Sequence, residues 1–169
     1  MHLEDVLGVQ IPATDFKGDI HLSDAEKSWI SQIEEMGIKD DFWIINAAGK
    51  LDFTAKIINP DKLQEVVDHF KGKIQFVQVG EKDHFHPKLE GVIDLIGKTD
   101  IRQLVRLVYH SIGVVSPVSF LMHLAAAVEM KRTPPKTRAA VIYGSNREPI
   151  QWEAYPHHFY LHCGSSLSC

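Results

Sequence analysis

The pattern of apolar and polar residues changes its period within the stretch 112–127, IGVVSPVSFLMHLAAA. A short apolar run over 112–115 is followed by Pro117, and this length and ending are typical of a buried parallel strand. From there the apolar residues recur every three or four positions, which predicts a helix over 118–129. Ser119 then lies near the start of this helix, where unpaired backbone N–H groups and the helix dipole favour an anion.

The same alternation between apolar runs and helical spacing repeats along the chain. Short apolar runs predict further buried strands over 42–45, over 74–79, within 91–97 and over 139–143. Helical spacing with capping residues predicts further helices over about 24–36, from Asn59 to Gly72 and from Thr99 to about Val108. Strands alternating with helices predict an α/β fold, a Rossmann-like parallel sheet with helices on both faces.

The chain is long enough for one domain with a sizeable core, since it has 169 residues. We divide it into an N-terminal lead-in and helix over 1–40, the Rossmann-like domain over 41–156, and a C-terminal tail over 157–169. The tail is rich in aromatic residues and histidine, and its apolar residues show no regular spacing.

Composition and charge narrow the function classes. The net charge of −4 gives no electrostatic reason to expect a nucleic-acid partner. No apolar run approaches the roughly 20 residues that span a bilayer, and the N-terminus lacks the basic start and apolar core of a signal peptide. The two cysteines build no disulfide framework, so we expect a cytoplasmic protein.

The loops that leave the predicted strands should gather at the carboxyl edge of the sheet. They begin near Asn46, Gly80, Gly97, Ser116 and Gly144. Several of these residues are glycines, which are used where the backbone turns tightly or approaches a ligand. Simple turn geometry is the alternative for each glycine taken alone.

Residues in two of these loops could meet a phosphate-bearing ligand. Lys50 and Lys56 follow the first strand and could reach a phosphate, and Thr54 would add a hydroxyl group beside them. Glu81 follows the second strand, where an acid often accepts hydrogen bonds from ribose hydroxyls in nucleotide-binding folds. The alternative for the two lysines is that they are surface residues in solvent. The alternative for Glu81 is that its charge only interacts favourably with the start of the following segment.

Histidines form two further clusters. His84 and His86 have a spacing that occurs in metal sites, but such sites also need a third and a fourth ligand. Candidates for these are Asp83, His110 and His123; a polar loop is the alternative, and we assign no metal. A second, loose cluster contains His157, His158, His162 and Cys163.

The residues identify no catalytic group. A Walker loop and a Gly-x-Ser-x-Gly elbow are absent, and no pair of carboxylates stands out.

Longer motifs cover roughly residues 42–156. They are INAAGK (45–50), KII (56–58), VQVGE (77–81), IGKTDIRQL (96–104), SPVSFLMHLAAA (116–127), VIYGS (141–145) and REPIQWEAYP (147–156). In these motifs the chain resembles the C-terminal half of the family 9 glycosyltransferases, the ADP-heptose:lipopolysaccharide heptosyltransferase superfamily. It looks closest to an uncharacterised, heptosyltransferase-like branch.

The resemblance implies one half of a two-domain GT-B fold. In that family the C-terminal half binds the sugar nucleotide, and the N-terminal half binds the acceptor and carries the catalytic base. Lys56 would then bind the donor phosphates and Glu81 would lie near the ribose. Ser119 and His123 would belong to the motif around the diphosphate and the sugar, and Gly144 would lie in a further loop at the same edge.

The resemblance also implies a function and its partners. The donor would be a nucleotide-diphosphate sugar such as ADP-heptose, with no cofactor, in lipopolysaccharide biosynthesis. We expect little activity without an N-terminal acceptor-binding domain. The partners that we expect are the sugar nucleotide and either such a domain or further copies of the chain in a homo-oligomer.

Two positions depart from the family's Asp-Ser/Thr-Gly-x-x-His motif, because Val118 replaces the acid and Phe120 replaces the glycine. The first change removes an acceptor for sugar hydroxyls, and the second adds bulk where the backbone should approach the ligand. Ile58 also replaces a family tryptophan. A non-enzymatic Rossmann-like module with a degenerate site therefore remains an alternative, as does a histidine-rich metal-binding protein.

Overall fold

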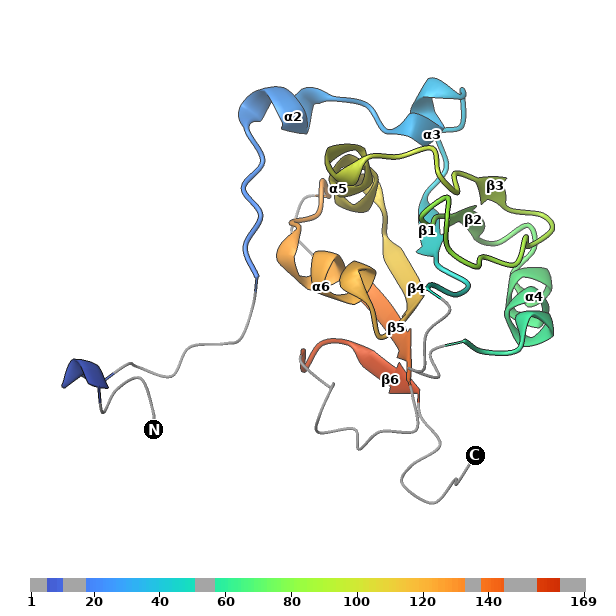
Figure 1. Cartoon of the computed structure of the whole chain (residues 1–169). Coiled ribbons are helices and arrows are strands. Elements are labelled where there is room, and N and C mark those ends of the chain that lie inside the picture. Colours follow the sequence, from blue (N-terminus) through green and yellow to red (C-terminus); the bar gives the residue numbers. More distant parts are fainter. Residues whose placement is uncertain (1–5, 11–17, 51–56, 133–137, 145–154, 162–169) are drawn as a thin grey trace, which may run out of the picture.

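The computed structural model describes residues 6–10, 18–50, 57–132, 138–144 and 155–161. Within these ranges, six parallel strands form one sheet in the order β3-β2-β1-β4-β5-β6 (Figure 1). The strands are β1 (Phe42–Ile45), β2 (Gln75–Gln78), β3 (Ile93–Asp94), β4 (Gly113–Pro117), β5 (Ala139–Tyr143) and β6 (Phe159–Leu161).

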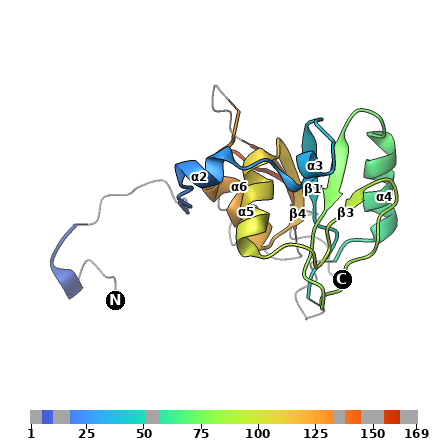
Figure 2. The ribbon, with the colours of Figure 1, turned by 90° about the horizontal axis from the view of Figure 1, so that it is seen from above.

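Helices cover both faces of this sheet (Figure 2). They are α2 (Asp24–Ser28), α3 (Gln32–Glu35), α4 (Pro60–His69), α5 (Ile101–His110) and α6 (Phe120–Ala127). The larger core packs α5 and α6 against one face, and the smaller core packs α4 against the other. Successive side chains of β1 point to opposite faces of the sheet, so Ile44 packs in the larger core and Ile45 in the smaller. The predicted fold class is confirmed.

Local signals in the sequence explain where the main helices begin. The Asn59 side chain accepts a hydrogen bond from the Asp61 N–H, and Pro60 occupies the first helical position of α4. Asp100 and Gln103 form a reciprocal capping box at the start of α5. Among the described residues, no helix has the length and apolar character that a membrane crossing requires.

The single helix predicted over 24–36 is wrong, because the segment forms the two short helices α2 and α3. Trp29 is extended, and the Ser31 side chain accepts a hydrogen bond of 3.0 Å from the Glu34 N–H. Ser31 thereby caps a second helix and ends the first. Gly37, with a φ of 82°, follows α3 as a glycine following a helix commonly does.

The sequence did not predict β6, which lies beyond residue 156, in the segment that we took for a tail. It pairs with β5 in parallel, with Val141 opposite Phe159. Its sequence, Phe-Tyr-Leu, is apolar but only three residues long, which is shorter than the runs of about 4–8 residues that indicate a buried strand. The rest of our division of the chain stays a prediction.

Candidate functional site

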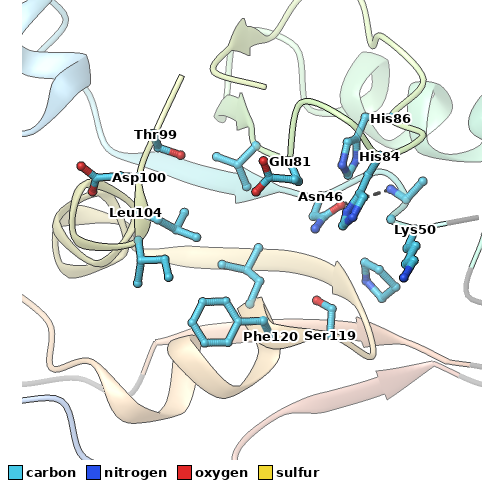
Figure 3. A pocket seen from close by; sticks show the side chains of 17 residues that line it. Asn46, Lys50, Glu81, His84, His86, Thr99, Asp100, Leu104, Ser119 and Phe120 are labelled. Atoms are coloured by element: carbon cyan, nitrogen blue, oxygen red, sulfur yellow. Dashed lines mark hydrogen bonds between the residues drawn. The ribbon is translucent and has the colours of Figure 1, made fainter. Parts of the chain in front are cut away.

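The strand order has a switch point between β1 and β4. From these two neighbouring strands the chain proceeds to β2 and β3 on one side and to β5 and β6 on the other. In open parallel sheets, ligands bind in the crevice that this arrangement leaves at the carboxyl ends of the strands. A cavity of about 630 Å³ lies there, lined by the segments that follow β1, β2, β3 and β4 (Figure 3).

Three of the predicted site residues line this one cavity. Lys50 comes from the loop after β1, Glu81 from the loop after β2, and Ser119 from the start of α6. Thr54 and Lys56 lie outside the described residues. The roles that we assigned to all five stay predictions.

The other two predicted residues do not line the cavity. The Nδ1 atom of His123 lies 2.7 Å from the Tyr155 hydroxyl oxygen, and the two rings meet edge to face. Gly144 follows β5, and its N–H donates to the Leu161 carbonyl at 2.8 Å. His123 thus contacts the segment before β6, and Gly144 extends the pairing of β5 with β6.

The cavity is open at the start of α6. Ser119 precedes this helix with extended backbone, but its side chain makes no capping hydrogen bond. Its hydroxyl oxygen instead lies 2.8 Å from that of buried Ser116, which donates to the Pro117 carbonyl at 2.8 Å. The first N–H groups of α6 are therefore not capped by Ser119, and this helix end favours an anion.

The loop after β2 is held rigidly beside the loop after β1. The fully buried Gln78 side chain donates to the Pro87 carbonyl at 2.7 Å and accepts from the Leu89 N–H at 3.0 Å. In addition, Gly49 and Phe85 form an isolated antiparallel bridge, in which the Phe85 N–H donates to the Gly49 carbonyl at 3.2 Å. These bonds place His84 and His86 in the cavity wall.

His86 packs directly against the end of β2. A Cβ atom at Gly80 would lie only 2.4–2.6 Å from the His86 ring, so glycine is required for this contact. Both ring nitrogens of His86 are shielded from solvent and have no hydrogen-bond partner among the described residues. Burial lowers the pKa of His86, and nearby His84 lowers it further, so His86 is neutral at pH 7.

Apolar side chains line the opposite end of the cavity. Figure 3 shows Phe120 and Leu104 there. Ile101 and Leu121 also line the cavity, and Phe120 and Ile101 are 54% and 67% exposed. Asp100 is at this end too, but its carboxylate caps α5. Sequence reasoning did not assign His84 or His86 to a phosphate-binding cavity, because only the folded loops show what each side chain faces. It did place Phe120 beside the ligand, and the ring does line the cavity.

The structure gives His84 and His86 no further metal ligands within the ranges that it describes, since no group of three or more His, Cys, Asp or Glu side chains is placed there to hold a metal ion. The ring centroids of His84 and His86 are 6.2 Å apart.

Residues 79–155 match the model of glycosyltransferase family 9 (heptosyltransferase). The resemblance to glycosyltransferase family 9 is confirmed. The matched residues include Glu81, Ser119, His123 and Gly144. No curated protein matches the chain at a significant level.

Solved glycosyltransferase structures share the fold. The glycosyl transferase family 9 protein from Veillonella parvula DSM 2008 has a TM-score of 0.65 and 15% identity over 89% of this chain and 44% of that one. The ADP-heptose lps heptosyltransferase II of E. coli has a TM-score of 0.60 and 20% identity over 85% of this chain and 44% of that one. The chain therefore has the fold of a family 9 domain and spans less than half the length of either structure.

Proposed function

We propose that this domain binds a nucleotide-diphosphate sugar, such as ADP-heptose, as the donor-binding half of a heptosyltransferase-like glycosyltransferase. The observation that supports this most directly is the cavity at the switch point between β1 and β4, into which the start of α6 opens. The family match over 79–155 covers the segments after β2, β3 and β4 that line it.

The cavity offers what a leaving diphosphate needs. The positive end of α6, which the Ser119 side chain does not cap, and the ammonium group of Lys50 would stabilise the negative charge that develops as the glycosidic bond breaks. Lys56 would supply a second cation. Glu81 lies between these groups and the apolar end, where its carboxylate would accept hydrogen bonds from ribose hydroxyls.

Transfer also requires that the acceptor hydroxyl be positioned and deprotonated. We assign this step to an N-terminal acceptor-binding domain, because the chain spans only 44% of the two solved glycosyltransferases. Such a domain could belong to a separate partner, or a second copy could cover the site. We place the function in cytoplasmic lipopolysaccharide biosynthesis.

Isothermal titration calorimetry with ADP, UDP, GDP and their glucose conjugates tests the proposal. We expect one nucleotide series to bind, and Lys50→Ala or Lys56→Ala to weaken its affinity about tenfold, as loss of a charge-assisted hydrogen bond does. Lys73→Ala is the matched control, since Lys73 is exposed in the turn before β2 at the opposite edge. The proposal fails if no nucleotide binds, or if Lys50 and Lys56 can both be replaced without effect.

One observation favours a second function, a non-enzymatic module with a degenerate site. Phe120 is the first residue of α6, and its ring lines the cavity where a glycine would leave the backbone free. If nucleotides bind the Phe120→Gly variant but not the natural chain, the Phe120 ring blocks the site. The natural protein is then better described as a non-enzymatic module.

A further inference from the structure

Lys50 and His84 are brought together by the backbone of two loops. The isolated antiparallel bridge joins Gly49 to Phe85, so Lys50 and His84 are the next cross-strand pair. Both side chains line the cavity, and they lie at the end that also holds Ser119 (Figure 3). Neither the fold nor the family match assigns a role to His84.

The charges around this pair favour an anion. Lys50 faces His84 from the loop after β1, and the positive end of α6 faces both from across the cavity. On its own loop His84 has four titratable neighbours. Neutral His86 and the carboxylate of Glu81 also line the cavity, whereas Lys82 and Asp83 are exposed charges beside it that offset each other. Asp100 lies at the far end and is engaged as a cap.

We propose that Lys50 and His84 together form a phosphate subsite in which His84 becomes protonated when the phosphate binds. This rests on the proposed function and adds to it that donor binding is coupled to proton uptake. A bound phosphate favours the charged form of His84, because its oxygens accept hydrogen bonds from the imidazolium and ammonium groups. The affinity for the donor should therefore rise as the pH falls.

ADP-glucose is the appropriate probe, because both of its phosphates keep their charge between pH 6 and pH 8. Calorimetry of the full chain at the two pH values should show about tenfold tighter binding at pH 6, the effect of one charge-assisted hydrogen bond. Repeating the titration in two buffers of different ionisation enthalpy should show proton uptake on binding. His84→Gln should bind with less than about a twofold difference between the two pH values and without that uptake.

His69→Gln is the matched control, since His69 is exposed in the last turn of α4, away from the cavity. It should keep the full pH dependence. Titrations in EDTA separate this subsite from a metal site at His84 and His86. The subsite predicts identical binding, whereas loss of binding in EDTA would overturn it.

Inorganic pyrophosphate separates failure of the subsite from failure of the proposed function. If pyrophosphate binds with the same dependence on His84 while no nucleotide binds, the subsite is supported and the nucleotide-binding function fails. If ADP-glucose binds equally at both pH values, or His84→Gln keeps the full pH dependence, the subsite is wrong and the function stands. If neither probe binds, both are wrong.

Discussion

The two edges of the sheet differ in how far a positively charged side chain is buried. At the carboxyl edge, Lys50 is exposed and lines an open cavity. At the amino edge, Arg138 precedes β5 with only 2% of its surface exposed. Its guanidinium group donates hydrogen bonds to five backbone carbonyls, those of Val108, Ser111, Ala125, Val128 and Glu129.

This difference follows from the direction of the helices. The carbonyl groups that end α5 and α6 point to the amino edge, where they attract a cation and are satisfied by Arg138. Burial lowers the pKa of Arg138 to about 10, so the side chain stays charged at neutral pH. The N–H groups that begin α6 point to the opposite edge, where Ser119 leaves them uncapped. Arg138 closes the amino edge, whereas the carboxyl edge holds the cavity.

The largest effect should come from removing the buried cation. Arg138→Met leaves several buried carbonyl groups without a donor, each at a cost of about 1–3 kcal/mol, so we expect the free energy of unfolding to fall by at least about 3 kcal/mol. Urea denaturation measures this. Arg132→Met is the control, since Arg132 pairs with Asp41 at the surface and should cost under about 1 kcal/mol. Equal losses would contradict the comparison.

Acid should weaken the same edge. His158 precedes β6 and is 6% exposed. Burial, with smaller contributions from His157, His123 and Arg138, lowers its pKa to about 4. Between pH 6.5 and pH 4 the unfolded chain therefore binds more protons than the folded chain, and stability falls as the pH falls. From pH 7 to pH 5 this group should remove about 2 kcal/mol of the unfolding free energy.

Urea denaturation of the natural chain and of His158→Gln across this pH range checks the effect. The variant should lose less stability on acidification. An identical slope in both proteins would show that His158 is not buried in its neutral form.

A smaller effect is expected where the cavity wall meets β2. Gly80→Ala places a methyl group against the His86 ring and should cost about 1–3 kcal/mol, because the ring must move. The displaced ring should also weaken nucleotide binding in the cavity. Gly49→Ala is the matched control, since its added methyl group meets nothing within 4 Å. Thermal denaturation and calorimetry of both variants compare them, and a neutral Gly80→Ala would contradict the packing.

The smallest effect on stability should come from the open edge itself. Phe120→Ala removes a ring that is 54% exposed, so the free energy of unfolding should change by no more than about 0.5 kcal/mol. The adjacent Leu121, 3% exposed, should cost about 2–5 kcal/mol when replaced by alanine. Urea denaturation of the two alanine variants tests whether the Phe120 ring at the cavity rim contributes to the free energy of unfolding. A large loss for Phe120→Ala would assign that ring to the core.

The sequence predicted the elements with strong local signals. Apolar runs located β1, β2, β4 and β5, and the capping residues Asn59 and Asp100 located α4 and α5. Two predictions failed where the local signal was ambiguous. An apparent single helix ends at Trp29 and begins again after Ser31, and β6 has only three residues, too few to show a period.

Of the candidate site, sequence reasoning assembled Lys50, Glu81 and Ser119, because each follows the end of a predicted parallel strand and such ends share one edge. It could not place His123, whose helical position leaves open which neighbour it faces. It also could not join His84 to Lys50, since their pairing depends on one bridge between two loops.

The sequence by itself therefore determined the kinds of element, their order along the chain and the edge at which the loops gather. These features follow from the local periods of apolar residues and from capping, which act within a few residues. Only the tertiary structure decided that β1 and β4 are neighbours, that Arg138 closes one edge and that the cavity opens at the other. Such contacts join residues far apart in the chain, and they depend on how the helices pack across the sheet rather than on any local pattern.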